Sequence, residues 1–244
     1  MPDFYKLIDR ALQDKLTFIA DPILDPISYG FTKSIERYIY LREKYPDIHI
    51  MIGIGNITEL THADTSGINM IMLGIVEELK LNHILTTQVS RHCSTVIRET
   101  DLARRIIHAA SENNITPKHI NNGLLINHGH KDYAYTSDEL SDMKSNIKDK
   151  NYRIYVNDDG VHLFNKTIYK VFSDPYDFYE FLEVDEDSGH SFYLGVELAR
   201  AQIAYQLRKE YSQDEELDWG CLIDKKADNK LQSKELGPTF KKRK

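Results

Sequence analysis

This sequence has few cysteines, and it lacks long apolar runs and an excess of basic residues. Two cysteines, Cys93 and Cys221, in 244 residues are too few and too far apart to suggest a disulfide framework or a metal cluster. No stretch approaches the roughly 18 apolar residues of a membrane span, and the first residues lack the apolar core of a secretory signal. The 31 Lys and Arg are outnumbered by 38 Asp and Glu, whereas nucleic-acid binding normally needs a basic face. We therefore expect a cytoplasmic protein that binds neither nucleic acid nor membrane.

Residues 1–112 alternate short apolar runs with amphipathic segments. The runs at 16–21, 48–54 and 83–87 predict β-strands, and a helical apolar pattern follows each one. Such alternation predicts a parallel sheet with right-handed crossovers. A closed (β/α)₈ barrel typically takes about 250 residues, so these units predict either a small open sheet or part of a larger barrel. The helix after the second strand is expected to face inward with Ile68, Ile71, Met72, Ile75 and Leu79.

Residues 113–222 predict a small α+β extension. Thr136 and Glu139 have the spacing of a capping box at a helix start. Residues 152–172 alternate around Asp159–Gly160, which predicts antiparallel hairpin strands. A helix is expected at about 190–211, with an inward face of Phe192, Val196, Ala199, Ile203 and Leu207. Residues 223–244 are charged and predict a disordered tail.

Polar residues follow all three predicted parallel strands, at the end where α/β folds place their binding sites. A buried carboxylate such as Asp21 can accept two N–H groups from a flat heterocycle such as a pterin. The side chain of Asn56 offers both a donor and an acceptor, and Gly53 and Gly55 would let a ring approach the backbone. Structural alternatives stay open: Asp21 and Asn56 also suit turns, and Asp64 and Thr65 suit helix caps.

Other candidate motifs are weaker. Arg91 or Arg98 could hold an anion near a helix start, although an isolated arginine is usually a surface residue. His92 and Cys93 are adjacent in sequence, so their side chains point apart and do not predict a catalytic pair. The stretch at 127–132 has three possible metal ligands at alternate positions, but no fourth ligand is evident.

The segments at 19–31 and 52–69 resemble the two central motifs of the pterin-binding barrel superfamily, which includes dihydropteroate synthases and methyltetrahydrofolate–corrinoid methyltransferases. Asp21–Pro22, Gly53 to Asn56, and Asn69 match the methyltransferase pattern in order. The sequence is most similar to dihydropteroate synthase-related proteins of methanopterin-type cofactor biosynthesis, over about residues 5–222. The resemblance implies the C-terminal part of a TIM-barrel-like pterin-binding domain at 1–112.

The resemblance further implies a function in reduced-pterin (folate- or methanopterin-type) biosynthesis. Dihydropteroate-synthase-like chemistry would condense a pterin methyl diphosphate with an arylamine. The implied pterin contacts are Asp21, Asp25, Gly53, Gly55 and Asn56, and the implied anion or second-substrate contacts are Ser90, Arg91 and Arg98. No catalytic residue is indicated. The alternatives are a non-catalytic pterin-binding or barrel-completing subunit, and a pterin-dependent methyltransferase.

The sequence also departs from that family. Members usually carry further barrel strands upstream, and the synthases use one of those strands for metal and diphosphate. The Ser-Arg-Lys signature of the synthases is also missing, and Asn56 stands near the position of its lysine. Magnesium therefore remains possible without identifiable ligands, and we expect an N-terminal half-barrel subunit or a homodimer to cover the exposed sheet edges.

Overall fold

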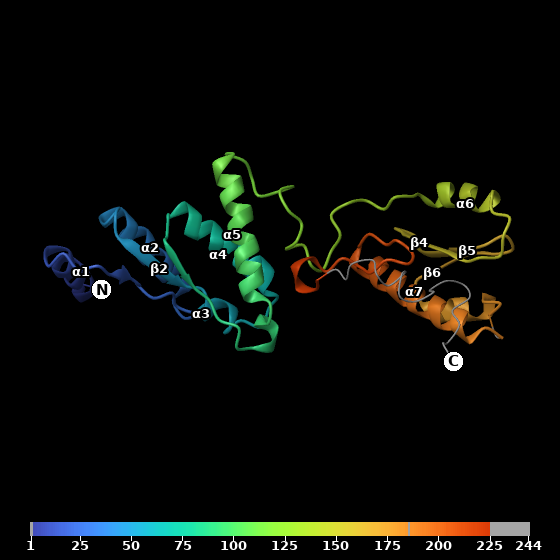
Figure 1. The fold of residues 1–244 in the computed structure, drawn as a ribbon, viewed down its shortest axis with the longest axis horizontal. Coiled ribbons are helices and arrows are strands. Elements are labelled where there is room, and N and C mark those ends of the chain that lie inside the picture. The colour runs from blue at the N-terminus through green and yellow to red at the C-terminus, as the bar shows by residue number, and fades with distance from the viewer. Residues whose placement is uncertain (1, 185, 225–244) are drawn as a thin grey trace. The chain divides into compact units, whose positions relative to one another are not determined.

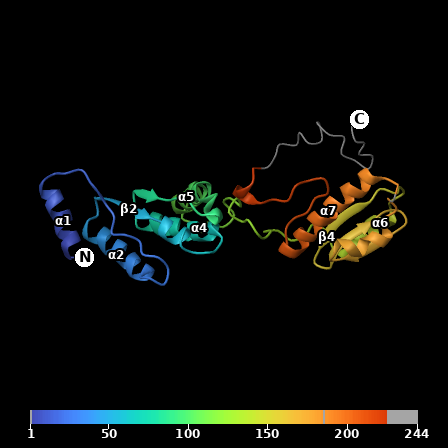
Figure 2. The same cartoon turned by 90° about the horizontal axis from the view of Figure 1, so that it is seen from below.

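The computed structural model describes residues 2–184 and 186–224 and divides the chain into two compact units between Leu124 and Leu125. Figures 1 and 2 show the order of elements within each unit. The sequence pattern changes at 112/113, where α5 ends, but the following segment still belongs to the first unit because Leu124 packs against its core. Of the predicted disordered tail, residues 225–244 lie outside the described residues. None of the described helices is long and apolar enough to cross a membrane.

Unit 1 is a parallel α/β unit. Its sheet has three strands in the order β1-β2-β3, with Ile19 paired to His49 and Met51 paired to His83. The sheet is open and does not close into a barrel within the described residues. The elements in chain order are α1 (Pro2–Gln13), β1 (Ile19–Ala20), α2 (Phe31–Lys44), β2 (His49–Gly53), α3 (Gly55–Thr58), α4 (Thr65–Glu78), β3 (His83–Leu85), the 3-10 helix η1 (Arg91–Cys93) and α5 (Val96–Glu112).

The core of unit 1 lies around the central strand. Ile50 and Ile52 of β2 are fully buried, and Met72 of α4 packs in the same cluster. The prediction that Ile71 faces inward was wrong, because its side chain is 67% exposed. Asn69 takes up part of the buried face of α4, so a polar residue displaces the apolar pattern there.

Unit 2 places α7 against an antiparallel sheet in the order β4-β5-β6. The hairpin prediction is confirmed, since Asn157 pairs with Gly160 across the turn. The capping box at Thr136 and Glu139 is also confirmed. The elements are α6 (Ser137–Ser145), β4 (Arg153–Asn157), β5 (Gly160–Phe164), β6 (Tyr169–Phe172), η2 (Pro175–Phe181), α7 (Ser188–Leu207) and η3 (Gly220–Leu222).

The inward face predicted for the last long helix was partly wrong. Phe192 is 70% exposed and Ala199 is also exposed. Glu197 is buried instead, because its carboxyl group accepts hydrogen bonds from Arg200 and from the hydroxyl of Tyr211. The buried positions of α7 are Leu194, Glu197, Leu198, Ala201 and Ala204.

Candidate functional site

The carboxyl ends of β1, β2 and β3 meet at one edge of the unit 1 sheet, where parallel α/β proteins bind ligands. Asp21 directly follows β1. A one-turn helix, α3, begins right after β2 at Gly55 and carries Asn56. The sequence did not predict this helix. In the structure, the residue before it, Ile54, also has helical backbone angles. This short helix therefore places Asn56 directly after the carboxyl end of the central strand.

Asp21 stabilises a turn, as the structural alternative to ligand binding predicted. Its Oδ1 accepts a hydrogen bond from the backbone N–H of Ile23 at 2.8 Å and from the hydroxyl of Tyr38 at 3.1 Å. Burial, followed by the negative charge of Asp21, raises the pKa of Tyr38, so the phenol stays a donor. The other carboxylate oxygen, Oδ2, accepts no hydrogen bond from the described residues.

Arg37 holds the loop between β1 and α2 and was not identified as a site residue from the sequence. Its guanidinium donates to the carbonyls of Pro22 and Ile23 and, at 2.7 Å, to Oδ2 of Asp25. Ile23 has a φ of 63°, a strained value for a β-branched residue. Asp25 is thus paired with a cation that fixes a strained loop, and its carboxylate already has a structural partner.

Asn56 joins this loop to the central strand end. Its side-chain amide donates to the carbonyl of Leu24 at 2.7 Å. The side chain is exposed, and its Oδ1 has no hydrogen-bond partner among the described residues. An amide group carries two N–H donors, so one donor and the oxygen stay available. The structure therefore brings Asn56 together with the loop that holds Asp21 and Asp25.

The two glycines at this edge have different surroundings. A Cβ on Gly55 would lie 2.9 Å from Oγ1 of Thr87, so close packing within the protein already accounts for that glycine. A Cβ on Gly53 would meet no atom within 4 Å. Only Gly53 therefore faces open space that a ligand could enter.

Glu59 organises the loop after β3 and was not among the predicted site residues. Its carboxylate accepts hydrogen bonds from the backbone N–H groups of Val89 and Ser90, each at 2.8 Å, and from the hydroxyl of Thr87. The Val89 N–H and then Ser90 hold the pKa of Glu59 at about 2. Ser90, a predicted anion contact, thus gives its backbone N–H to the protein's own carboxylate.

Arg91 and Arg98 both have exposed side chains. Arg91 begins η1, and its backbone carbonyl accepts a hydrogen bond from the N–H of Ser94. Its guanidinium makes no hydrogen bond or ion pair with the described residues, so it is available to an anion. Arg98 lies in the first turn of α5. Neither side chain donates a hydrogen bond to Asp21 or Asn56 among the described contacts.

His92 and Cys93 do not form a catalytic pair. Nε2 of His92 and Sγ of Cys93 each contact the carbonyl of Thr58, at 3.0 and 3.3 Å. Burial, followed by the charge of Glu59, raises the pKa of Cys93 to about 11. The thiol is therefore protonated at neutral pH and unsuited to nucleophilic attack.

Glu99 lies at the centre of a buried polar network behind the strand ends. Its carboxyl group accepts hydrogen bonds from Thr65 at 2.6 Å, Asn69 at 2.9 Å and Thr95 at 2.7 Å. Asn69, whose position matched the family pattern, is fully buried here and also accepts from Thr100. The network ties the first turn of α4 to the first turn of α5.

A metal centre is not evident in the described part of the chain. No group of three or more His, Cys, Asp and Glu side chains there is arranged to hold a metal ion. In the motif at 127–132, Nδ1 of His128 lies 3.1 Å from the carbonyl of Leu207. Magnesium ligands thus stay unidentified.

Comparisons with known proteins give one relative of unknown activity. No family model matches the chain, and no solved structure is significantly similar to it. The uncharacterized protein MJ0107 of Methanocaldococcus jannaschii is 30% identical over 238 residues, covering 87% of this chain. The match covers 44% of that protein, so the chain spans less than half the length of its relative.

Proposed function

We propose that unit 1 binds a reduced pterin at the carboxyl ends of its strands, as the resemblance to dihydropteroate synthase-related proteins implies. One observation carries the proposal. Asp21 and Asn56, at adjacent strand ends, each keep a side-chain oxygen without a hydrogen-bond partner among the described residues, and Gly53, the last residue of β2, faces open space. A carboxylate and an amide together match the donor-rich edge of a pterin.

The proposed roles follow from the hydrogen-bond donors and acceptors that each side chain does not use within the protein. Oδ2 of Asp21 would accept N–H groups of the pterin, and the amide of Asn56 would contact a ring nitrogen and the neighbouring carbonyl. Gly53 would lie under the ring, and Asp25 would act through Arg37 by holding the loop. Arg91 would face the diphosphate or an anionic arylamine.

The proposed reaction is the condensation of a pterin methyl diphosphate with an arylamine. The amine nitrogen forms a bond to the methylene carbon, the carbon–oxygen bond to diphosphate breaks, and the amine loses a proton. No residue is assigned as the base, and no residue is assigned to magnesium. We place this activity in the cytoplasm, where the thiols of Cys93 and Cys221 would stay reduced.

The open sheet supports a second candidate function. A chain that supplies three strands of a larger barrel would act as a pterin-binding or barrel-completing subunit, with turnover only in the assembly. Turnover by the chain alone would reject this second candidate.

Calorimetric titration with a reduced pterin tests the proposal. Asp21→Ala and Asn56→Ala are each expected to weaken binding about tenfold or more, since each removes a hydrogen bond worth about 1.5 kcal/mol. Asp142→Ala and Asn113→Ala, which change the same residue types at exposed positions elsewhere, should leave affinity unchanged. Equal affinity in all four variants, or no binding to the chain or its assembly, would refute the pterin site.

A further inference from the structure

Two histidine rings contact each other at the amino ends of neighbouring strands in unit 1. Nδ1 of His49, the first residue of β2, lies 3.0 Å from Nε2 of His83, the first residue of β3. The ring centroids are 5.2 Å apart. His49 is exposed and His83 is half-buried. Solvent and ions can therefore reach the pair.

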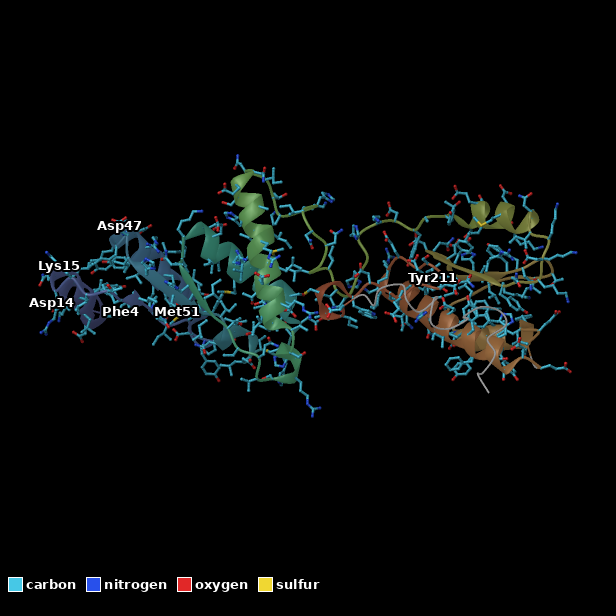
Figure 3. All side chains as sticks on the ribbon, in the orientation of Figure 1. Phe4, Asp14, Lys15, Asp47, Met51 and Tyr211 are labelled. Carbon is cyan, nitrogen blue, oxygen red and sulfur yellow. The ribbon has the colours of Figure 1, made fainter. Side chains whose placement is uncertain are left out.

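The alternation of side chains along the strand directs this pair away from the core. Successive side chains of a strand point to opposite faces of its sheet. His49 and Met51 thus share one face of β2, while Ile50 and Ile52 are fully buried on the other. Met51, which is labelled in Figure 3, pairs with His83 across the two strands. Both rings therefore project from the less buried face of the sheet.

The contact between the rings adds little to the stability of the fold. A hydrogen bond between solvent-accessible neutral groups contributes little, because water competes for both partners. Neither ring forms an ion pair or a second hydrogen bond with the described residues. The sheet nevertheless holds two imidazoles, the side chains that most often bind metals, at contact distance.

We propose that His49 and His83 together bind a divalent transition-metal ion of the Ni²⁺ or Cu²⁺ type through Nδ1 and Nε2. With metal–nitrogen bonds of about 2.0–2.1 Å, two nitrogens 3.0 Å apart enclose an angle of about 95° at the metal. An angle near 90° suits the tetragonal geometry of these two ions, and imidazole is a good ligand for both. A tetrahedral zinc site would need the two nitrogens further apart.

Metal binding replaces the hydrogen bond between the rings. In the neutral pair, one of the two contacting nitrogens carries a hydrogen and donates it to the other. The ion takes the lone pairs of both contacting nitrogens, and the hydrogen moves to the second nitrogen of its own ring. The described residues offer no group of three His, Cys, Asp or Glu side chains, so water fills the remaining positions. The thioether of Met51 is a soft ligand that suits Cu⁺ rather than Ni²⁺.

This metal site is separate from the pterin site and goes beyond the proposed function. His49 begins β2 and Gly53 ends it. The two ends are about 13 Å apart in an extended strand. Imidazole nitrogens also do not suit Mg²⁺, which prefers oxygen ligands. The histidine pair is therefore not the magnesium site of a diphosphate reaction.

Calorimetric titration of the full chain with Ni²⁺, without any pterin, tests the inference. We expect one ion per chain. His49→Asn and His83→Asn should each weaken binding about tenfold or more, since the loss of a residue that merely supports a ligand already costs about 10–100-fold. His108→Asn, at an exposed histidine of α5, should leave the affinity unchanged, as should Met51→Leu. Circular dichroism checks that each variant is folded.

Nitrogen-15 NMR of the histidine rings identifies the coordinating atoms, with diamagnetic Zn²⁺ in place of Ni²⁺. We expect the largest shifts at Nδ1 of His49 and Nε2 of His83. Three results would overturn the inference: no binding of Ni²⁺, equal affinity in the two variants of the pair and in His108→Asn, or a loss in Met51→Leu as large as that in the histidine variants. The last result would indicate a soft thioether site instead.

Discussion

The buried network around Glu99 gives the sharpest prediction about stability. Glu99 is 1% exposed, and two of its three donors, Thr65 and Asn69, are also buried. Glu99→Ala leaves both donors without an acceptor, and each stranded buried donor costs about 1–3 kcal/mol. With the lost packing of the side chain, we expect the variant to lose about 3–5 kcal/mol of unfolding free energy.

Glu99→Gln keeps the shape and separates hydrogen bonding from size. The amide oxygen can take the bonds from Thr65 and Asn69, while the amide nitrogen donates to Thr95, whose hydroxyl can rotate to accept. No donor is stranded, so we expect a loss of only about 1 kcal/mol. Glu112→Ala, at the exposed end of the same helix, is the control and should change stability by less than about 0.5 kcal/mol.

Native-state hydrogen exchange in α4 and α5 is the suitable assay. The single tryptophan, Trp219, lies in unit 2, so its fluorescence does not report on this network. Exchange resolves the local free energy of opening in each helix. A loss below about 1 kcal/mol in Glu99→Ala, or equal losses in the Ala and Gln variants, would refute the reasoning from stranded donors.

Two further predictions concern the loop after β3. Because the pKa of Glu59 is about 2 in the folded protein, below its ordinary 4.5, its stabilising contribution is complete above about pH 4.5 and is lost as pH falls toward 2. Amide exchange at Val89 and Ser90, corrected for intrinsic rates, should accelerate over that window, whereas Glu59→Gln should remove the pH dependence; an unchanged profile would contradict the contact. Cys93, with a pKa of about 11, should react with iodoacetamide at pH 8 about 100-fold more slowly in the native protein than in denaturant, as mass spectrometry of the peptide can measure, and similar rates would contradict its burial.

The sequence predicted those features that depend on local patterns. The hairpin turn at Gly160 and the capping box at Thr136 depend on neighbouring residues, and both are confirmed. The buried faces of α4 and α7 were partly wrong because Asn69 and Glu197 face inward, and their partners Glu99 and Tyr211 come from elsewhere in the chain.

Glu59 and Arg37 were not predicted as site residues for the same reason: their partners are distant in the sequence. The partners of Glu59 are Val89 and Ser90, about 30 positions away in the sequence. Arg37 lies within an amphipathic helix, where an arginine usually faces solvent. Only the structure shows that Arg37, on α2, forms an ion pair with Asp25 of the loop after β1.

The contacts already made within the protein decide which substitutions can test the strand-end site. Asp25 neutralises Arg37, so removing its carboxylate would release the loop and weaken any ligand indirectly. Glu59 is likewise committed to backbone N–H groups. Asp21 and Asn56 differ because each retains an oxygen that the described residues leave without a partner. A ligand that depends on Asp25 or Glu59 but not on Asp21 or Asn56 would therefore be sensing the integrity of the loops. Asp21 and Asn56 also hold the first loop through Ile23, Tyr38 and Leu24, so loss of binding in Asp21→Ala and Asn56→Ala assigns direct contact when amide exchange in that loop is unchanged.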